Sequence, residues 1–294
     1  MSEVTVVIPA MNRAHLLSRA LDSVKRQTFP PFEVIVVDDA SSDSTAEVAR
    51  THGARVLTMP QRSGSGPARN AGIAAAETEW IAFLDSDDEW EPQHLELLLR
   101  ASAPHVLVCA PAHTTSGRAI GNVTGRPVDL TSARLLVPGD AIVTSGTIVR
   151  RHVLEKVGGF RALARAQDLD LWLRVLECGS GLATTTGTVL YHEHLEQASR
   201  DADLMRECFD WIIEHYSDRP WLTSRVRTAS YGRVMWDDLR KGQRKRDWPL
   251  VRRSAKWLAT HPWAWTAVLR LLRGRRLSRV RGAERSVASA GQPQ

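Results

Sequence analysis

The first 90 residues alternate between short apolar runs and longer segments in which apolar residues recur at helical spacing. The apolar runs are rich in valine and isoleucine and are bounded by proline or acidic residues, a pattern typical of strands buried on both faces. We expect strands at residues 4–8, 33–37, 55–57 and 80–84. The intervening segments predict helices that end near residues 27, 50 and 76. This alternation predicts a doubly wound, mostly parallel α/β sheet.

From residue 92 to residue 199 the pattern is less regular, and Gly/Thr-rich loops separate the predicted elements. We expect helices at 92–100, 151–157 and 168–177, strands at 105–109 and 186–190, and an extended segment at 141–149. Beyond residue 200 the apolar spacing is helical. The sequence therefore predicts an α/β domain over residues 1–200, a helical region over 201–282, and a disordered tail over 283–294.

Charge divides the chain at nearly the same place. The formal net charge of +6 consists of −5 over residues 1–199 and +11 over residues 200–294. Seven of the ten tryptophans also follow residue 200. Two parts with such different surfaces are expected to have different partners.

The cysteines and the N-terminal residues bear on the compartment. Cys109, Cys178 and Cys208 are far apart and odd in number, which argues against a disulfide framework and against a cysteine zinc site. The first residues lack the pattern of a signal peptide, and no apolar stretch reaches the roughly 18 residues of a spanning helix. We expect a cytoplasmic protein.

Acidic residues directly follow two of the predicted strands. Asp38-Asp39 ends the second strand, and Asp85-Ser86-Asp87 ends the strand at 80–84. In parallel sheets ligands bind beyond the carboxyl ends of the strands, and paired carboxylates suit a hard divalent cation that bridges diphosphate oxygens. Turn formation and helix capping also explain such acids, so the pattern alone leaves both interpretations open.

Several short motifs occur in an order that is similar to one known family. They are Val6-Val7-Ile8-Pro9 with Asn12-Arg13, residues 36–41, Gly66-Pro67-Ala68-Arg69-Asn70, residues 83–88, Gly158-Gly159-Phe160, residues 168–174, and residues 191–194. This ordered set covers residues 3–199 and resembles the family 2 inverting glycosyltransferases of the GT-A fold. The resemblance implies a metal-dependent GT-A catalytic domain, followed here by a helical C-terminal region.

The resemblance also implies roles for individual residues. The donor nucleotide would contact Pro9, Asn12, Arg13, Asp39, Arg69, Asp85 and Asp87. Within this set Asp39 would accept a hydrogen bond from a uracil-like base, and the two arginines would lie near the ribose and diphosphate. Asp87 and His194 would bind Mn²⁺ or Mg²⁺. Asp168 would be the general base.

Elementary chemistry supports these roles. A departing diphosphate accumulates negative charge that a divalent cation stabilises, and a single inverting displacement needs one carboxylate to take the acceptor proton. Structural explanations stay open: Arg69 as a helix-surface residue, His192 or His194 as a polar loop residue, and Asp168 or Asp170 as a helix cap. The register of the family motif favours His194 over His192 as the metal ligand. Gln167 stands where the family commonly has Glu, which is expected to alter acceptor contacts, and Gln61 stands where Asn is frequent.

The C-terminal region combines apolar stripes with basic faces. One predicted helix has a stripe of Leu250, Val251, Ser254, Trp257 and Leu258, with Arg252, Arg253 and Lys256 on the other side, and further arginines follow at 270–281. Such a region suits the interface of an anionic membrane. Packing on the catalytic domain or self-association is the alternative. Nucleic-acid binding is not expected, because no known module accompanies the charge.

The sequence therefore favours an inverting glycosyltransferase that moves a sugar from a nucleotide-diphosphate donor, with UDP expected, to a glycan or lipid-linked acceptor. We expect it in cell-surface polysaccharide or glycolipid synthesis, on the inner face of the membrane. Two alternatives remain: a non-catalytic sugar-nucleotide or glycan-binding protein on the same fold, and a nucleotidyltransferase. The latter typically needs a Gly-rich, Lys-containing loop near the N-terminus, which this chain lacks.

Overall fold

The computed structural model describes residues 3–122, 125–137, 142–192, 202–245, 248–262, 264–265 and 268–269. The chain divides into two compact units: unit 1 comprises residues 1–131 and 142–200, and unit 2 comprises residues 132–141 and 201–294. The segment 132–141, which the sequence division at residue 200 places in the first domain, belongs to unit 2. Its helix α5 (Ser132–Leu136) packs on α9 (Ser224–Lys245).

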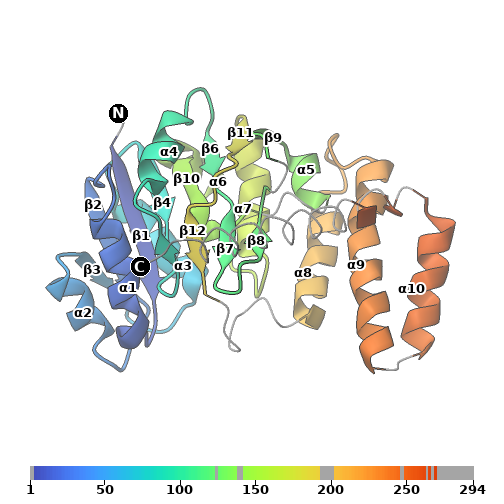
Figure 1. The fold of residues 1–294 in the computed structure, drawn as a ribbon, viewed down its shortest axis with the longest axis horizontal. Helices are drawn as coiled ribbons and strands as arrows, with labels where there is room; N and C mark the ends of the chain where they lie inside the picture. The colour runs from blue at the N-terminus through green and yellow to red at the C-terminus, as the bar shows by residue number, and fades with distance from the viewer. Residues whose placement is uncertain are drawn as a thin grey trace, which may run out of the picture. The chain divides into compact units, whose positions relative to one another are not determined.

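Among the described residues, eight strands form the central sheet of unit 1, in the order β3-β2-β1-β4-β10-β6-β11-β9 (Figure 1). The strands are β1 (Val4–Ala10), β2 (Glu33–Asp38), β3 (Arg55–Thr58), β4 (Trp80–Phe83), β6 (Leu107–Cys109), β9 (Val128–Leu130), β10 (Thr147–Arg150) and β11 (Gly181–Ala183). Every residue of β1 and β4 is buried, as expected for a sheet covered on both faces. The predicted α/β class is confirmed.

The strand order reverses at β1. The chain runs outward from β1 to β2 and β3, then returns to place β4 on the other side of β1, and these pairs are parallel. Such a reversal opens a ligand-binding crevice at the carboxyl ends of the strands. β10 departs from the parallel pattern, since it is antiparallel to both β4 and β6.

The direction of β10 brings a further segment to the carboxyl ends of these strands. Thr147, the first residue of β10, pairs with Phe83, the last residue of β4. The 3₁₀ turn Thr144–Gly146 therefore lies beside the carboxyl end of β4. The sequence predicted a continuous extended segment at 141–149, and this turn corrects that expectation.

The helices of unit 1 follow the predicted order with modest changes at their ends. They are α1 (Ala14–Lys25), α2 (Thr45–Thr51), α3 (Ser65–Ala75), α4 (His94–Arg100), α6 (Arg151–Val157) and α7 (Gln167–Leu176). α3 packs closely on β1 because Gly72 has no side chain: a Cβ there would lie 2.4 Å from Val7 Cγ1.

A second sheet, which the sequence did not predict, has the order β5-β12-β7-β8. Its strands are β5 (Glu89–Trp90), β7 (Ala112–Thr114), β8 (Ala119–Ile120) and β12 (Val189–Tyr191). Strands of two or three residues are too short to show a clear period. β5 begins directly after the acidic residues 85–88, so this small sheet anchors the acidic loop.

Unit 2 is helical in its described part, with α8 (Ala202–His215), α9 and α10 (Trp248–Thr260) following one another. Met235 of α9 and Leu258 of α10 form an apolar cluster with Ala264 and Val268. Trp257 packs edge-on against Tyr231, so the predicted stripe faces a helical neighbour. Among the described residues, no helix is both long and apolar enough to span a membrane.

Candidate active site

The loops that follow β1 and β2 are joined by hydrogen bonds. Asn12 Oδ1 accepts from Ser42 N at 2.8 Å, and Asn12 N donates to Ser41 Oγ at 2.9 Å. Asn12 and Ala40 both have left-handed backbone conformations, with φ of 52° and 56°. Asparagine often adopts this conformation, but alanine adopts it only at an energetic cost, so the surrounding contacts must hold Ala40 in place.

Pro9 and Arg13 belong to the same rim, by which we mean residues 9–13, at the end of β1 and before α1. Pro9 lies near the end of β1, where it pairs with Val37 of β2. Arg13 N donates to Thr45 Oγ1 at 2.8 Å, which ties the start of α1 to the start of α2. The predicted donor residues from the first strand thus surround the carboxyl ends of β1 and β2.

Asp39 fixes the Gly/Ser loop that leads into α3. Its Oδ1 accepts from Ser63 N and its Oδ2 accepts from Gly64 N, both at 2.7 Å. The side chain is almost fully buried. A contact from Asp39 to a nucleotide base stays a prediction; in the structure its carboxylate positions the helix that carries Arg69.

Arg69 of α3 connects the acidic loop with the segment before α7. Its guanidinium forms an ion pair with the Asp85 carboxylate. Its Cζ also lies 5.3 Å from the centre of the Phe160 ring, within the range of a cation–π contact. Arg69 is buried, and its Nε has no hydrogen-bond partner among the described residues. It is therefore not an ordinary helix-surface arginine.

The acidic residues after β4 form a tight turn. Asp88 N donates to Asp85 O at 3.1 Å, which closes the turn around Ser86 and Asp87. Asp88 is buried, and desolvation, with the charges of Asp85 and Asp87, raises its pKa to about 8. No sequence signal separated Asp88 from its acidic neighbours, and the structure adds it to the site.

Asp168 lies at the start of α7, two residues after Ala166, which has a left-handed φ of 55°. Its Oδ1 accepts from Leu169 N at 2.8 Å, and Thr144 Oγ1 lies 3.5 Å from its Oδ2. Burial raises the pKa of Asp168, the hydrogen bond from Leu169 and the charge of Arg69 lower it, and the charge of Asp85 raises it again. A carboxylate with a raised pKa is suited to accept a proton.

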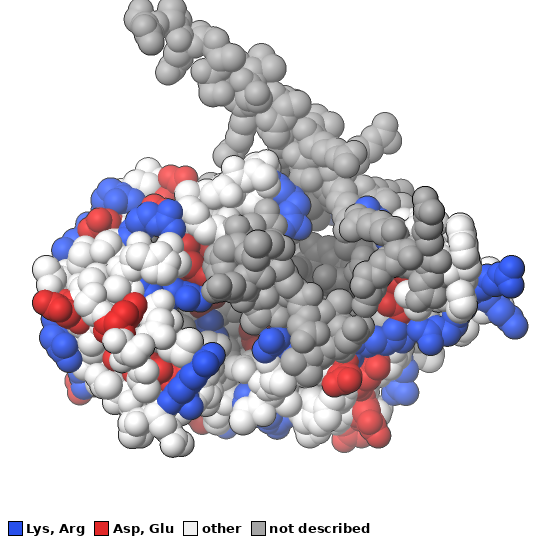
Figure 2. Space-filling model, turned by 90° about the horizontal axis from the view of Figure 1, so that it is seen from below, with Lys and Arg blue, Asp and Glu red and all other residues white. Residues whose placement is uncertain are grey.

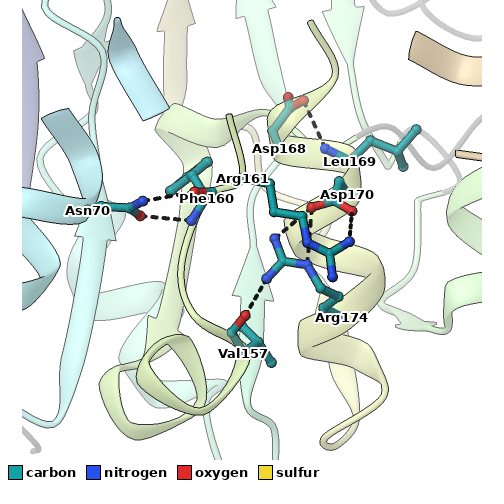
Figure 3. A network of polar contacts seen from close by, with 8 residues as sticks. All are labelled: Asn70, Val157, Phe160, Arg161, Asp168, Leu169, Asp170 and Arg174. Atoms are coloured by element: carbon teal, nitrogen blue, oxygen red, sulfur yellow. Dashed lines mark hydrogen bonds and ion pairs between the residues drawn. The ribbon is translucent and has the colours of Figure 1, made fainter. Parts of the chain in front are cut away.

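Asp170 has a different role from Asp168 (Figure 3). Its Oδ2 accepts from Arg174 Nη2 at 2.6 Å, and its Oδ1 accepts from Arg161 Nη1 at 3.1 Å. Arg174 also donates to Val157 O at 2.6 Å, while the Asp168 carboxylate points away from this network. Asp170 is fully buried and holds α7 to the preceding segment, so Asp168 is the acid of this pair that faces the site.

The donor set of the acidic turn fits a hard divalent cation. Asp85 and Asp87 supply carboxylate oxygens, the ligands that Mg²⁺ and Mn²⁺ prefer. Burial is the main cause of the raised pKa of Asp88, and the negative charges of Asp85 and Asp87 add to it. Within the described part of the chain, however, no three metal-binding side chains converge. His194 lies outside the described residues, so its predicted role as a ligand stays a prediction.

His192, the other histidine considered from the sequence, has a structural partner. Its Nε2 lies 2.9 Å from Glu89 Oε1, and its backbone N donates to Asp88 Oδ1 at 3.2 Å. Gln167 Nε2 donates to Leu163 O at 2.6 Å, whereas Gln167 Oε1 is buried and has no hydrogen-bond partner within the part of the chain that the structure describes. The residue that departs from the family pattern thus helps to shape the loop before Asp168.

The fold and this arrangement define a class of protein: a GT-A enzyme with basic and acidic groups at the strand crevice and a carboxylate at the start of a neighbouring helix. The family described as Glycosyl transferase family 2 matches residues 5–157. The chain belongs to that family and is a glycosyltransferase, as the resemblance implied.

Curated relatives agree with this assignment, and a solved structure shares the fold. An Escherichia coli protein named UDP-Glc:alpha-D-GlcNAc-diphosphoundecaprenol beta-1,3-glucosyltransferase WfgD is 27% identical, over 69% of this chain and 81% of its own. A pre-mycofactocin glycosyltransferase of Mycobacterium tuberculosis is 32% identical, over 66% of this chain but only 43% of its own. The crystal structure of S. aureus TarS 1–349 with UDP-GlcNAc shares the fold, with a TM-score of 0.61, 20% identity, and 72% and 66% coverage.

The chain corresponds to only part of several curated relatives. It spans 53% of a Nostoc glycosyltransferase and 30% of a Rhizobium meliloti succinoglycan biosynthesis protein. The similarity to those proteins therefore concerns the glycosyltransferase domain and does not extend over their whole length.

Proposed function

We propose that this glycosyltransferase moves a sugar from a UDP-linked donor to an acceptor hydroxyl, with inversion at the anomeric carbon and with Mn²⁺ or Mg²⁺ as cofactor. The observation that carries the proposal is the position of Arg69. It pairs with Asp85 at the end of β4, and its charge acts on Asp168 at the start of α7. A candidate donor residue and the candidate base thus share one electrostatic environment.

The residues have distinct tasks in the transfer. Asp39 and the rim from Pro9 to Arg13 shape the nucleotide pocket, and Arg69 and Asp85 orient the ribose and diphosphate. The cation, which Asp87 and His194 would hold, would stabilise the charge of the departing diphosphate. Asp168 takes the proton of the acceptor hydroxyl on a carboxylate oxygen as that hydroxyl attacks the anomeric carbon.

The acceptor is proposed from the relatives. The Escherichia coli relative is named for a lipid-linked GlcNAc diphosphate acceptor, and a Bacillus subtilis relative, 28% identical, is named for teichuronic acid biosynthesis. We infer a glycan or lipid-linked acceptor in cell-surface polysaccharide assembly. Because these relatives are named for different products, they support this general class of acceptor rather than one particular sugar.

Unit 2 suits contact with an anionic membrane surface. Among the described residues, four large apolar side chains are exposed, and three of them, Trp248, Trp265 and Leu269, belong to unit 2. Arg252, Arg253 and Lys256 are exposed on α10, and basic side chains project from this part of the surface in Figure 2. Exposed tryptophan beside basic residues favours an anionic interface. We infer that the protein binds the inner face of the cell membrane through α10.

One experiment tests the transfer reaction. Purified protein is incubated with a panel of UDP-sugars and lipid-linked acceptors, with and without Mn²⁺, and release of UDP and glycosylated product is measured. We expect Mn²⁺-dependent transfer that Asp168→Asn abolishes, while the control Glu177→Gln, which removes an exposed acid from the end of the same helix, stays active. Binding without UDP release would support the binding-protein alternative. Formation of UTP and sugar 1-phosphate from a UDP-sugar when inorganic diphosphate is added would support a nucleotidyltransferase.

Membrane contact is tested with sedimentation of the full-length protein with vesicles. We expect the protein to pellet with vesicles rich in phosphatidylglycerol and to remain in solution with phosphatidylcholine alone. Replacement of Arg252, Arg253 and Lys256 by serine should release it. Replacing Arg26, Arg50 and Arg100, exposed arginines at or near the ends of unit 1 helices, is the matched control. Equal pelleting of all variants would contradict the role of α10.

A further inference from the structure

The acidic turn after β4 is held at both ends by one hydroxyl group. Ser145 Oγ accepts a hydrogen bond from Asp85 N at 3.1 Å and donates one to Asp88 Oδ2 at 2.6 Å. Asp85 and Asp88 are the first and last residues of the turn. Ser145 is fully buried, so water does not replace either contact.

Ser145 is itself fixed by the elements around it. It lies in the 3₁₀ turn before β10, which the antiparallel register places beside the end of β4. Its carbonyl oxygen accepts a hydrogen bond from Trp90 Nε1 at 2.5 Å. Trp90 stacks on His94, whose Nδ1 lies 2.6 Å from Thr188 Oγ1. These buried, hydrogen-bonded residues thus hold the Ser145 hydroxyl next to the acidic turn.

Asp88 extends this arrangement to the second sheet. Its other oxygen, Oδ1, accepts from the backbone N of His192 at 3.2 Å, directly after β12. The Asp88 carboxylate therefore joins the acidic turn to the segment before β10 and to the end of β12. Ser145 lies 57 positions after Asp88 in the chain, and His192 lies 104 positions after it. Asp85 and Asp87, whose charges repel each other, project from a turn whose two ends are fixed.

We propose that Ser145 and Asp88 are positioning residues that hold Asp85 and Asp87 ready for the divalent cation and the donor diphosphate. This inference rests on the proposed metal-dependent function. Neither residue needs to touch the donor: Ser145 fixes the two ends of the turn, and Asp88 transmits that constraint to β12. Groups that orient metal-binding carboxylates typically change metal affinity by about 10- to 100-fold when they are lost.

The test compares Ser145→Ala with Ser23→Ala. Ser23 is also fully buried, but its hydroxyl donates to Ala20 O within its own helix α1 and not to a residue of the acidic turn. Mn²⁺ affinity in the presence of UDP is measured by electron paramagnetic resonance of free Mn²⁺, and UDP affinity without metal is measured by calorimetry. Thermal unfolding of each variant reports the cost of losing a buried hydrogen bond.

We expect Ser145→Ala to weaken Mn²⁺ binding about 10- to 100-fold, whereas Ser23→Ala changes it less than about twofold. UDP binding without metal should be similar in both variants. Asp88→Asn should give a comparable defect, and the double variant should be little worse than either single one, because the two residues act as a unit. Wild-type Mn²⁺ affinity in Ser145→Ala, or additive losses in the double variant, would overturn the proposal.

The same measurements separate this inference from the proposed function. If the wild-type protein shows Mn²⁺-dependent UDP binding and transfer but Ser145→Ala binds Mn²⁺ equally well, only the positioning role is wrong. If the wild-type protein transfers sugar and binds UDP with no dependence on Mn²⁺, the metal assignment is wrong and the positioning role falls with it.

Discussion

Asn70 holds the main chain of Phe160 through a reciprocal pair of hydrogen bonds. Asn70 Nδ2 donates to Phe160 O at 2.8 Å, and Phe160 N donates to Asn70 Oδ1 at 2.7 Å (Figure 3). Gly159 permits this approach, since a Cβ at that position would lie 2.3 Å from Asn70 Oδ1. Two motifs that lie 90 residues apart in the sequence are thereby joined, and the loop toward Asp168 is positioned from α3.

Replacing Asn70 with Asp should weaken this connection. The variant loses the donor that satisfies Phe160 O and places a carboxylate oxygen against a carbonyl oxygen. We expect the free energy of unfolding to fall by about 1–3 kcal/mol, the range for a buried polar group left without its partner. Urea denaturation measures the change, with Gln93→Glu, an exposed amide, as control. An unfolding free energy equal to that of the wild type would show that the pair adds no stability.

Replacing Asp168 with Asn should abolish transfer without destabilising the fold. Loss of the general base lowers kcat by about 10²- to 10⁴-fold. Burial raises the pKa of Asp168, so its proton is bound more tightly in the folded state than in the unfolded state. The associated stabilisation is present below the ordinary aspartate pKa and is lost as pH rises through the raised value.

The sign of this effect gives a second measurement for Asp168→Asn. Above the raised pKa the wild-type protein bears the cost of a buried charge that the variant lacks. The variant should therefore be at least as stable as the wild type at pH 8, and its advantage should shrink toward pH 4. Melting temperatures across this range test it. A variant that is less stable at pH 8 would indicate that the carboxylate supports the fold.

Replacing Asp170 with Asn should give the opposite result, although only one residue separates the two acids. Asp170 is fully buried between Arg174 and Arg161, and removing its charge leaves Arg174 buried without its ionic partner. Breaking a buried ion pair from one side typically costs about 3–5 kcal/mol. We expect a lower melting temperature and lower activity in proportion to the folded fraction. A stable but inactive Asp170→Asn protein would instead place Asp170 in the chemistry.

The parts of the fold that the sequence predicted are those with strong local patterns. β1, β2 and β4 are continuous apolar runs because both faces of the sheet are covered, and α7 shows a clear helical period. The acids at strand ends indicated the right edge of the sheet. The assignment of individual roles, however, came from the family resemblance and not from spacing.

The remaining features depend on contacts between distant segments. The direction of β10 is set by pairing with β4 and β6, and no local pattern specifies it. Ser145 carries no motif, yet β10 brings it to the acidic turn. A left-handed conformation is unremarkable for asparagine, as at Asn12, but nothing in the sequence indicates it for Ala40 or Ala166.

The last prediction concerns Arg69, whose charge acts on two acids at once. In Arg69→Met, Asp85 loses its ionic partner, so donor binding should weaken; a lost hydrogen bond to a charged group corresponds to a fall in kcat/KM of about 10- to 100-fold. The Arg69 charge also lowers the pKa of Asp168, and the Asp85 charge raises it. Without Arg69 its lowering effect is lost while the Asp85 charge still raises the pKa, so the pKa of Asp168 rises further.

Because the base must be ionised to accept a proton, a higher pKa of Asp168 moves the acid limb of the pH–rate profile to higher pH. The profile of kcat/KM for Arg69→Met, compared with the wild type, measures this shift. Arg50→Met, which removes an exposed arginine from α2, should leave the limb in place. A large loss of kcat/KM with an unmoved acid limb would mean that Arg69 serves the donor alone, and that the electrostatic link between Asp85 and Asp168 has no part in proton transfer.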